Sequence, residues 1–313
     1  MAQTTQRPLK VGLALPDSEG YFDGGTARWS DLAAIARRAE EVGFDSLWVQ
    51  DHLLFRYPDQ EPEGPWESFS LLAALAAITS RVELGTLVTC VSYRNPALTA
   101  KIADTIDEIS GGRLILGLGA GWHEPEYRAF GYPFDHRYSR FEEALTIIHG
   151  LLRDGRIDFA GKYHQARECE LRPRGPRPHG PPIMLGTMGE RMLRLTARFA
   201  DSWNAWFTRT GNSPAGVAPL RVKVDAACAE VGRDPATLER TVAILVDLTG
   251  GSGVPRSLSS GEVPALTGSP EELADTLRAF AREGIAHVQA HVAPMTLAGV
   301  ERFAPVLELL DRG

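Results

Sequence analysis

Cysteine is scarce in this chain, and several features that define other protein classes are missing. The 313 residues include only Cys90, Cys169 and Cys228, which are odd in number and far apart. This spacing fits neither a disulfide framework nor a zinc knuckle, and it suits a reducing cytoplasm, where we expect the protein to work. No apolar run reaches 18 residues, and the polar stretch from Met1 to Pro8 lacks a hydrophobic signal region. We therefore expect no membrane partner.

Charge and motif content exclude further classes. The formal net charge of −7 is spread along the chain without a basic block, so we expect no nucleic-acid partner. His287 and His291 are four residues apart on an expected strand, a separation of roughly 13 Å that is too long for one metal ion. We therefore expect no metal site. A Ser-His-Asp hydrolase would need a GxSxG elbow, and the sequence contains none.

Apolar strands and amphipathic helices alternate along most of the chain. Expected strands lie at 9–15, 44–49, 82–88, 114–117, 182–185, 201–205, 241–246 and 285–292, and expected helices at 32–42, 71–78, 96–110, 141–152, 192–199 and 297–310. Ser30 is the expected N-cap of the first helix, and Gly43 ends it. Eight such strands favour a single α/β domain over 1–313, a (β/α)8 TIM barrel with insertion segments. An open doubly wound sheet would need a nucleotide fingerprint after its first strand, which Leu15 to Gly20 does not supply.

Three stretches interrupt the alternation. Residues 155–181 are rich in glycine, proline and arginine, which indicates an insertion outside the repeating unit. Residues 249–268 are full of glycine and serine, and we expect a mobile loop there. A long loop is also expected after Gly121.

An acid–histidine pair, Asp51-His52, follows the second expected strand. In a βα-barrel the carboxyl ends of the strands carry the chemistry. A neutral imidazole can accept or donate a proton near neutral pH, and a carboxylate at the same strand end adds polarity. The competing interpretation is a histidine that is merely hydrogen-bonded at the barrel rim.

Two glycine-rich loops indicate a flat, phosphate-bearing ligand. In Gly117 to Trp122, alternate glycines would let the backbone approach a planar ring, although a tight turn explains them equally. The spacing is GxGxG, and no helix is expected there, which separates it from the dinucleotide fingerprint. Gly186 to Arg191 lies between a strand and a helix, where free amides can hold a phosphate; the alternative is an ordinary βα loop. Together the two loops predict a planar cofactor across the barrel mouth.

With these segments the chain resembles the luciferase-like monooxygenase superfamily, and within it the branch of oxidoreductases that use the deazaflavin coenzyme F-420. The resemblance runs from about Val11 to Trp206. It rests on Ala39 to Asp45 with Asp51-His52, Leu84 to Val88 with Arg94-Asn95-Pro96, Ser110 to Arg113, Gly117 to Trp122 with Glu126, Phe130 to Phe134, and Pro182 to Gly189 with Ala200-Asp201.

The resemblance implies a coenzyme ring at the C-terminal mouth of the barrel, usually in a homodimer. A bulge with a non-prolyl cis peptide bond would support the ring from behind, at Leu87–Val88 by position. The loop Gly186-Thr187-Met188-Gly189 would hold the phosphate, and Gly119-Ala120-Gly121-Trp122 would lie beside the ring and ribityl chain. Asp51 is a further expected cofactor contact. His52 matches a histidine that acts at the hydride-transfer centre of some deazaflavin dehydrogenases.

One departure from the family narrows the expected chemistry. Sugar-phosphate dehydrogenases of the family pair that histidine with a tryptophan and a glutamate, at places that Arg56 and Trp122 occupy here. Sugar-phosphate oxidation is therefore not expected. Trp48, Trp122, Trp203 and Trp206 are candidates for an aromatic pocket, although core packing explains Trp48 and Trp203 equally well.

The leading hypothesis is a cytoplasmic oxidoreductase that transfers a hydride between coenzyme F-420 and a small organic substrate, with His52 as the catalytic residue. One alternative is an FMN-dependent monooxygenase supplied with reduced flavin by a separate reductase, since no nicotinamide fingerprint is present. The two rings differ at one position, where carbon favours hydride transfer and nitrogen permits reaction with dioxygen. The other alternative is a non-catalytic flavin-binding barrel, which a mouth plugged by 249–268 would favour.

Overall fold

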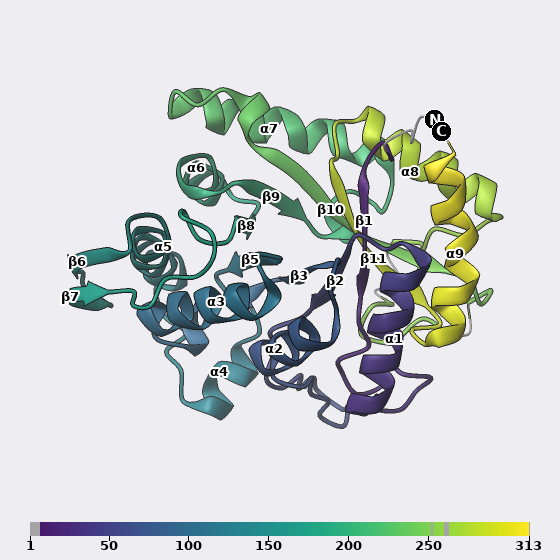
Figure 1. Cartoon of the computed structure of the whole chain (residues 1–313), viewed down its shortest axis with the longest axis horizontal. Helices are drawn as coiled ribbons and strands as arrows, with labels where there is room; N and C mark the ends of the chain where they lie inside the picture. Colours follow the sequence, from purple (N-terminus) through teal and green to yellow (C-terminus); the bar gives the residue numbers. More distant parts are fainter. Residues whose placement is uncertain (1–6, 252, 260–262, 313) are drawn as a thin grey trace.

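A computed structural model describes residues 7–251, 253–259 and 263–312, and in this part of the chain eight parallel strands close into a barrel (Figure 1). They are β1 (Lys10–Ala14), β2 (Ser46–Val49), β3 (Glu83–Thr86), β5 (Leu114–Gly119), β8 (Ile183–Gly186), β9 (Ser202–Ala205), β10 (Glu239–Asp247) and β11 (His287–Ala293). Their order is β3-β2-β1-β11-β10-β9-β8-β5, and β3 also pairs with β5, which closes the ring. The predicted TIM barrel is confirmed, and every predicted strand overlaps an observed one.

The third strand of the barrel is interrupted. β3 pairs with β5 through Leu84 and Gly85. The short β4 (Thr89–Cys90) continues this pairing with β5 farther along the chain. Leu87 and Val88 lie between the two pieces, and the peptide bond that joins them is cis, as the resemblance implied.

Helices surround the barrel (Figure 1). They are α1 (Trp29–Val42), α2 (Ser68–Ile78), α3 (Pro96–Ser110), α4 (Glu124–Phe130), α5 (Arg137–Asp154), α6 (Glu190–Phe199), α7 (Val217–Glu230), α8 (Pro270–Arg282) and α9 (Leu297–Asp311). None of those in the described residues is long and apolar enough to cross a bilayer. The six predicted helices are confirmed, whereas α4, α7 and α8 were not predicted.

The expected N-cap of the first helix was wrong. α1 begins at Trp29, so Ser30 already lies inside the helix and Arg28 is the N-cap. The reason is Asp31, whose Oδ2 accepts a hydrogen bond of 2.8 Å from the backbone N–H of Arg28 and so stabilises an earlier start. The predicted end is confirmed, because Gly43 follows with φ of 101°.

The predicted insertion is an antiparallel hairpin outside the barrel, at the left of Figure 1. It consists of β6 (Arg156–Ala160) and β7 (Gln165–Glu170), which pair only with each other. The expected long loop after Gly121 instead contains α4. Within 249–268, residues 252 and 260–262 lie outside the described residues; Leu258 is buried, and Leu266 pairs with Val246. The mobility of this stretch stays a prediction.

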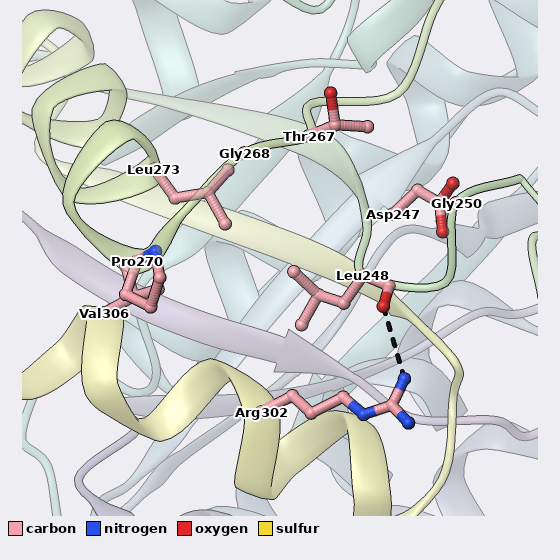
Figure 2. Close-up of a pocket in the computed structure, with 9 residues that line it drawn as sticks. All are labelled: Asp247, Leu248, Gly250, Thr267, Gly268, Pro270, Leu273, Arg302 and Val306. Atoms are coloured by element: carbon pink, nitrogen blue, oxygen red, sulfur yellow. Dashed lines mark hydrogen bonds between the residues drawn. The ribbon is translucent and has the colours of Figure 1, made fainter.

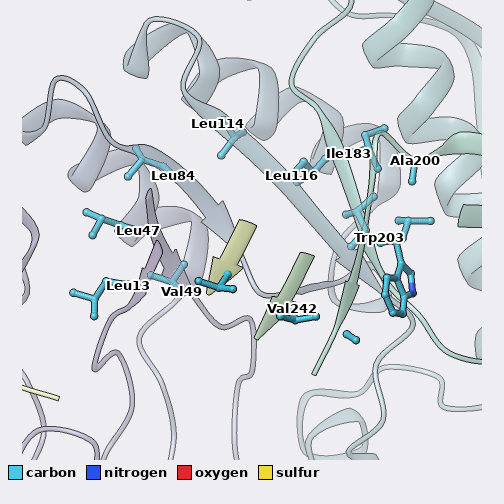
Figure 3. Close-up of a cluster of buried hydrophobic side chains, with 14 of the residues drawn as sticks. Leu13, Leu47, Val49, Leu84, Leu114, Leu116, Ile183, Ala200, Trp203 and Val242 are labelled. Carbon is cyan, nitrogen blue, oxygen red and sulfur yellow. The ribbon is translucent and has the colours of Figure 1, made fainter. Parts of the chain in front are cut away.

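The main hydrophobic core lies between the barrel and the helices. Figure 3 shows part of it, with Leu47, Leu84, Leu116 and Ile183 contributed by four strands. Helix residues such as Leu72 belong to the same cluster. Successive residues of a strand face opposite sides of the sheet. The strand residues next to those of the core therefore point into the barrel.

The barrel interior holds the indole of Trp48, seated over glycines of both neighbouring strands. A Cβ atom at Gly12 would lie 2.4 Å from Trp48 Nε1, and one at Gly85 would lie 2.2 Å from Trp48 Cζ3. The indole N–H donates to Ser46 Oγ at 2.7 Å, and this oxygen lies 2.7 Å from His287 Nε2. The two glycines are therefore required for a large ring to fit beside satisfied polar groups.

Candidate functional site

A cavity of about 790 Å³ lies at the C-terminal end of the barrel. Its wall contains all twelve residues predicted for the site: Asp51, His52, Leu87, Val88, Gly119, Ala120, Gly121, Trp122, Gly186, Thr187, Met188 and Gly189. The fold thus brings together segments that are up to 138 residues apart, from Asp51 to Gly189. Their individual roles stay predictions.

His52 forms a pair with a buried glutamate. Its Nδ1 lies 2.8 Å from Oε1 of Glu126, a side chain on α4 with no exposed surface. Glu126 Oε2 also accepts hydrogen bonds from the backbone N–H groups of Leu53 (2.9 Å) and Leu54 (3.3 Å). Burial alone would raise the pKa of Glu126, but the hydrogen bonds from His52 and Leu53 hold it below its usual value. The carboxylate is therefore ionised at neutral pH.

This pairing fixes the orientation of the imidazole. An ionised carboxylate only accepts hydrogen bonds, so Nδ1 of His52 must donate. Nε2 has no protein partner in the described part of the chain and belongs to a side chain that lines the cavity. The ring packs against Phe55, with 4.4 Å between centroids, and edge-on against Trp122 at 5.5 Å. The arrangement presents one imidazole nitrogen to a ligand in a defined place.

Asp51 lies in the cavity wall, but its carboxylate is committed to protein groups. Oδ2 accepts hydrogen bonds from Arg94 Nη1 (2.8 Å) and Cys90 N (2.9 Å), and Oδ1 accepts them from Arg94 Nη2 (2.8 Å) and Ser68 Oγ (2.7 Å). This bidentate ion pair ties the ends of β2 and β4 to the start of α2. Any contribution of Asp51 to cofactor binding is thus through the position of the strand ends.

Val88 projects from the strand break between two glycines. A Cβ atom at Gly119 would lie 2.7 Å from Val88 Cγ2, and one at Gly186 would lie 3.2 Å from Val88 Cγ1. Gly121 has φ of 71°, and a Cβ there would lie 1.9 Å from Tyr127 Oη. The alternating glycines of the sequence therefore leave room for the side chains of Val88 and Tyr127 at this side of the cavity.

The N-terminus of α6 faces the same cavity. Gly189 is its N-cap and supplies no side chain to bond the first free amides, so they remain available to an anion. The hydroxyl of Thr187 is held by Thr196 at 2.7 Å. Arg191, at the end of this loop, lines the cavity and donates through Nη2 to Glu142 at 2.7 Å. The uncapped backbone amides of this loop are therefore its candidate anion-binding groups.

Further wall residues come from β1, β9 and β11 and, apart from Trp206, were not predicted for the site. Asp17 and Tyr21 follow β1, Asn204 and Trp206 lie at the end of β9, and His291 lies near the end of β11. Their position at strand ends was a readable signal, but His291 had been considered only as a metal ligand. Of the four candidate tryptophans, Trp48, Trp122 and Trp206 line the cavity, and the fourth does not.

Asp17 is buried and accepts two hydrogen bonds from Gln50, from the backbone N–H at 2.7 Å and from Nε2 at 2.9 Å. Burial raises the pKa of Asp17 to about 7 despite these bonds. His291 is 7% exposed, and neither of its ring nitrogens has a partner among the described residues. Burial lowers the pKa of His291 to about 4, so its ring is neutral at pH 7.

A smaller hollow of about 380 Å³ lies between the start of α8 and α9 (Figure 2). Arg302 points across it and donates to the carbonyl oxygen of Leu248 at 3.2 Å. It contains none of the predicted site residues. In the described residues, no three histidine, cysteine, aspartate or glutamate side chains come together as a metal site would require.

These features define a TIM barrel with an interrupted third strand and a glycine-lined cavity at the C-terminal end of its strands. The chain belongs to the luciferase-like monooxygenase family, whose model matches residues 9–249. The predicted superfamily is therefore confirmed.

Among curated relatives, the pyrimidine monooxygenase RutA of Cronobacter sakazakii is 37% identical over 207 residues, 64% of this chain and 60% of that protein. The chain spans 56–64% of the length of this and two further RutA proteins. An F420-dependent secondary alcohol dehydrogenase has a similar fold, with a TM-score of 0.78, 21% identity and 96% and 99% of the two chains covered. Monooxygenase RslO1 of Streptomyces bottropensis also has a similar fold, with a TM-score of 0.77 and 20% identity. The match covers 97% of this chain and 98% of that chain.

Proposed function

We propose that this chain is an FMN-dependent monooxygenase that oxidises a small planar heterocycle. The observation that carries the proposal is one cavity in which a flat glycine-lined wall, an uncapped helix N-terminus and the His52–Glu126 pair converge. Relatives that share over a third of their aligned residues with this chain are named pyrimidine monooxygenases. This supports the FMN-dependent monooxygenase over hydride transfer with coenzyme F-420.

The residues of the cavity fit a flavin mononucleotide. Its volume of about 790 Å³ is in the range of cofactor and ligand sites. The isoalloxazine ring would lie against Val88 and the backbone of Gly119 to Trp122, and its phosphate would accept hydrogen bonds from the amides that follow Gly189. Reduced FMN, when bound, supplies the electrons for the reaction with dioxygen.

The side chains of the chain would then position substrate and move protons. Nε2 of His52 would accept a proton from the substrate or return one to the product, with Glu126 holding the ring in place through Nδ1. Trp122, which is 56% exposed beside His52, would cover the bound ring and limit access of water. A separate reductase that delivers reduced flavin, and a homodimer, are part of this proposal.

Hydride transfer with coenzyme F-420 is the second candidate. The observation that favours it is the glutamate partner of His52, because the resemblance links a histidine paired with a glutamate to the sugar-phosphate dehydrogenases of the deazaflavin branch. Glu126 supplies this partner, although Trp122 occupies the place where the family pattern puts it.

Equilibrium titration with FMN and with F-420, followed by turnover of uracil with reduced FMN and ¹⁸O₂, tests the proposal. We expect micromolar binding of FMN and one labelled oxygen atom in the product. Binding of F-420 without FMN would establish the second candidate instead. Binding of FMN without turnover of uracil or related heterocycles would support a non-catalytic barrel, although Ser257 and Leu258 of 249–268 line the cavity rather than fill it.

A further inference from the structure

The cavity has two halves that are built by different strands. The predicted cofactor segments come mostly from the β3–β4 break, β5 and β8, whereas Asp17 and His291 belong to the neighbouring strands β1 and β11. His291 lies beyond residue 249, where the family model ends. The second half is therefore a part of the cavity that the cofactor prediction leaves without a role.

His291 is a buried polar group that lacks a partner. Both ring nitrogens are buried and without a hydrogen bond in the described part of the protein, although the ring lines the cavity. A polar group in this situation destabilises the fold unless a ligand or water bonds it. Trp206 packs edge-on against the ring with 5.1 Å between centroids, which fixes its plane.

We propose that His291 and Asp17 form the substrate subsite, and that it takes a neutral planar ring with an N–H donor next to a carbonyl acceptor, as in cyclic amides and imides. A neutral imidazole has one donor and one acceptor nitrogen, which point in diverging directions, so the acceptor nitrogen can bond the N–H of such a ring. Burial disfavours the charged forms of both side chains, which makes a neutral ligand the best match. The indole of Trp206 supplies an aromatic wall for the planar ring of the ligand.

This inference rests on the proposed function, and it is tested by binding rather than by turnover. The full chain, loaded with FMN, is titrated with uracil and with 1,3-dimethyluracil, in which both N–H donors are replaced. We expect a preference of about 10–100-fold for uracil, the value of one or two buried hydrogen bonds. His291→Phe keeps the ring size but removes both nitrogens, and we expect its preference to fall below about 3-fold. His291→Gln, which retains a donor and an acceptor, should recover part of it.

His287 offers the matched control. It is buried on the same strand, but its Nε2 is bonded to Ser46 and it does not line the cavity. His287→Asn should keep the preference of the wild type. An undiminished preference in His291→Phe would show that the extra methyl groups act by size alone and would overturn the inference, as would equal binding of both probes by the wild type.

A second measurement does not depend on the stability of a variant. The imidazole ¹⁵N resonances of His291, identified by their loss in His291→Gln, should shift when uracil is added to the wild type and stay in place with 1,3-dimethyluracil. Unchanged resonances at saturating uracil would contradict the subsite. Failure of FMN to bind would refute the proposed function alone, because the same two titrations on the cofactor-free chain still decide whether this half recognises the N–H edge.

Discussion

Nδ1 of His52 lies 2.8 Å from Oε1 of Glu126, so a histidine of the cavity wall and a fully buried carboxylate act as one unit. The carboxylate also accepts two backbone N–H groups of the segment that follows His52. A helix outside the barrel thereby determines the position of a strand-end side chain.

The first prediction concerns this pair. Glu126→Gln keeps the shape but removes the charge that orients Nδ1, and we expect kcat/KM for the heterocycle to fall about 10–100-fold, while the Kd for FMN changes little. Steady-state kinetics and FMN titration measure the two effects separately. Glu124→Gln, an exposed position on the same helix, is the control and should behave like the wild type. Equal losses in both variants would show that the helix, and not the ion pair, is responsible.

The second prediction concerns the ion pair beneath the cavity wall. Arg94→Met leaves the carboxylate of Asp51 buried without its cation and should cost about 3–5 kcal/mol of unfolding free energy. The double variant that combines Arg94→Met with Asp51→Asn should lose less unfolding free energy than the two single variants together, because both charges are then absent. Urea unfolding of the four proteins gives the coupling energy. Arg38→Met, at an exposed ion pair with Glu301, should cost far less.

The third prediction concerns the seat of Trp48. Gly85→Ala places a methyl group 2.2 Å from the indole, and we expect a loss of about 1–3 kcal/mol. Trp48→Leu in the same chain should recover part of this loss, which thermal and urea unfolding would show. Gly25→Ala, where the nearest atom is 3.4 Å away, should change stability little. A Gly85→Ala protein as stable as the wild type would mean that the indole has room to move.

The fourth prediction concerns pH. The pKa of Asp17 is raised by burial to about 7, so between about pH 4 and 7 the folded state holds a proton that the unfolded state releases. The contribution of Asp17 to stability therefore falls as pH rises through this window, by about 1–4 kcal/mol. Asp17→Asn does not titrate, so its stability relative to the wild type should increase from pH 4 to 7 and level off above. Parallel urea midpoints across this range would contradict the prediction.

The barrel was predictable because its strands are short apolar runs bounded by polar or glycine residues. The missed helices lacked this clarity. Apolar residues of α7 occur on several faces, with Val222 exposed, so the periodicity is weak. The start of α8 could have been predicted from the sequence. Ser269 and Glu272 form a capping box, and Pro270 lies between them in the first turn.

The site was predictable where function depends on backbone and not where it depends on packing. Both glycine loops are local features of the sequence, and the structure places them in one cavity with the Leu87–Val88 break, which the resemblance implied. Glu126 became a partner of His52 only because α4 packs beneath the second strand end, which no local pattern states. His291 was tested against metal geometry alone, whereas its burial without a partner is visible only in three dimensions.

The division of the cavity between two sets of strands has an evolutionary consequence. With the proposed subsite on one side of the cavity, exchange of a few side chains on β1, β9 and β11 would alter which molecule is accepted and leave the opposite wall intact. Substrate preference and coenzyme retention are therefore free to diverge independently in descendants of this barrel.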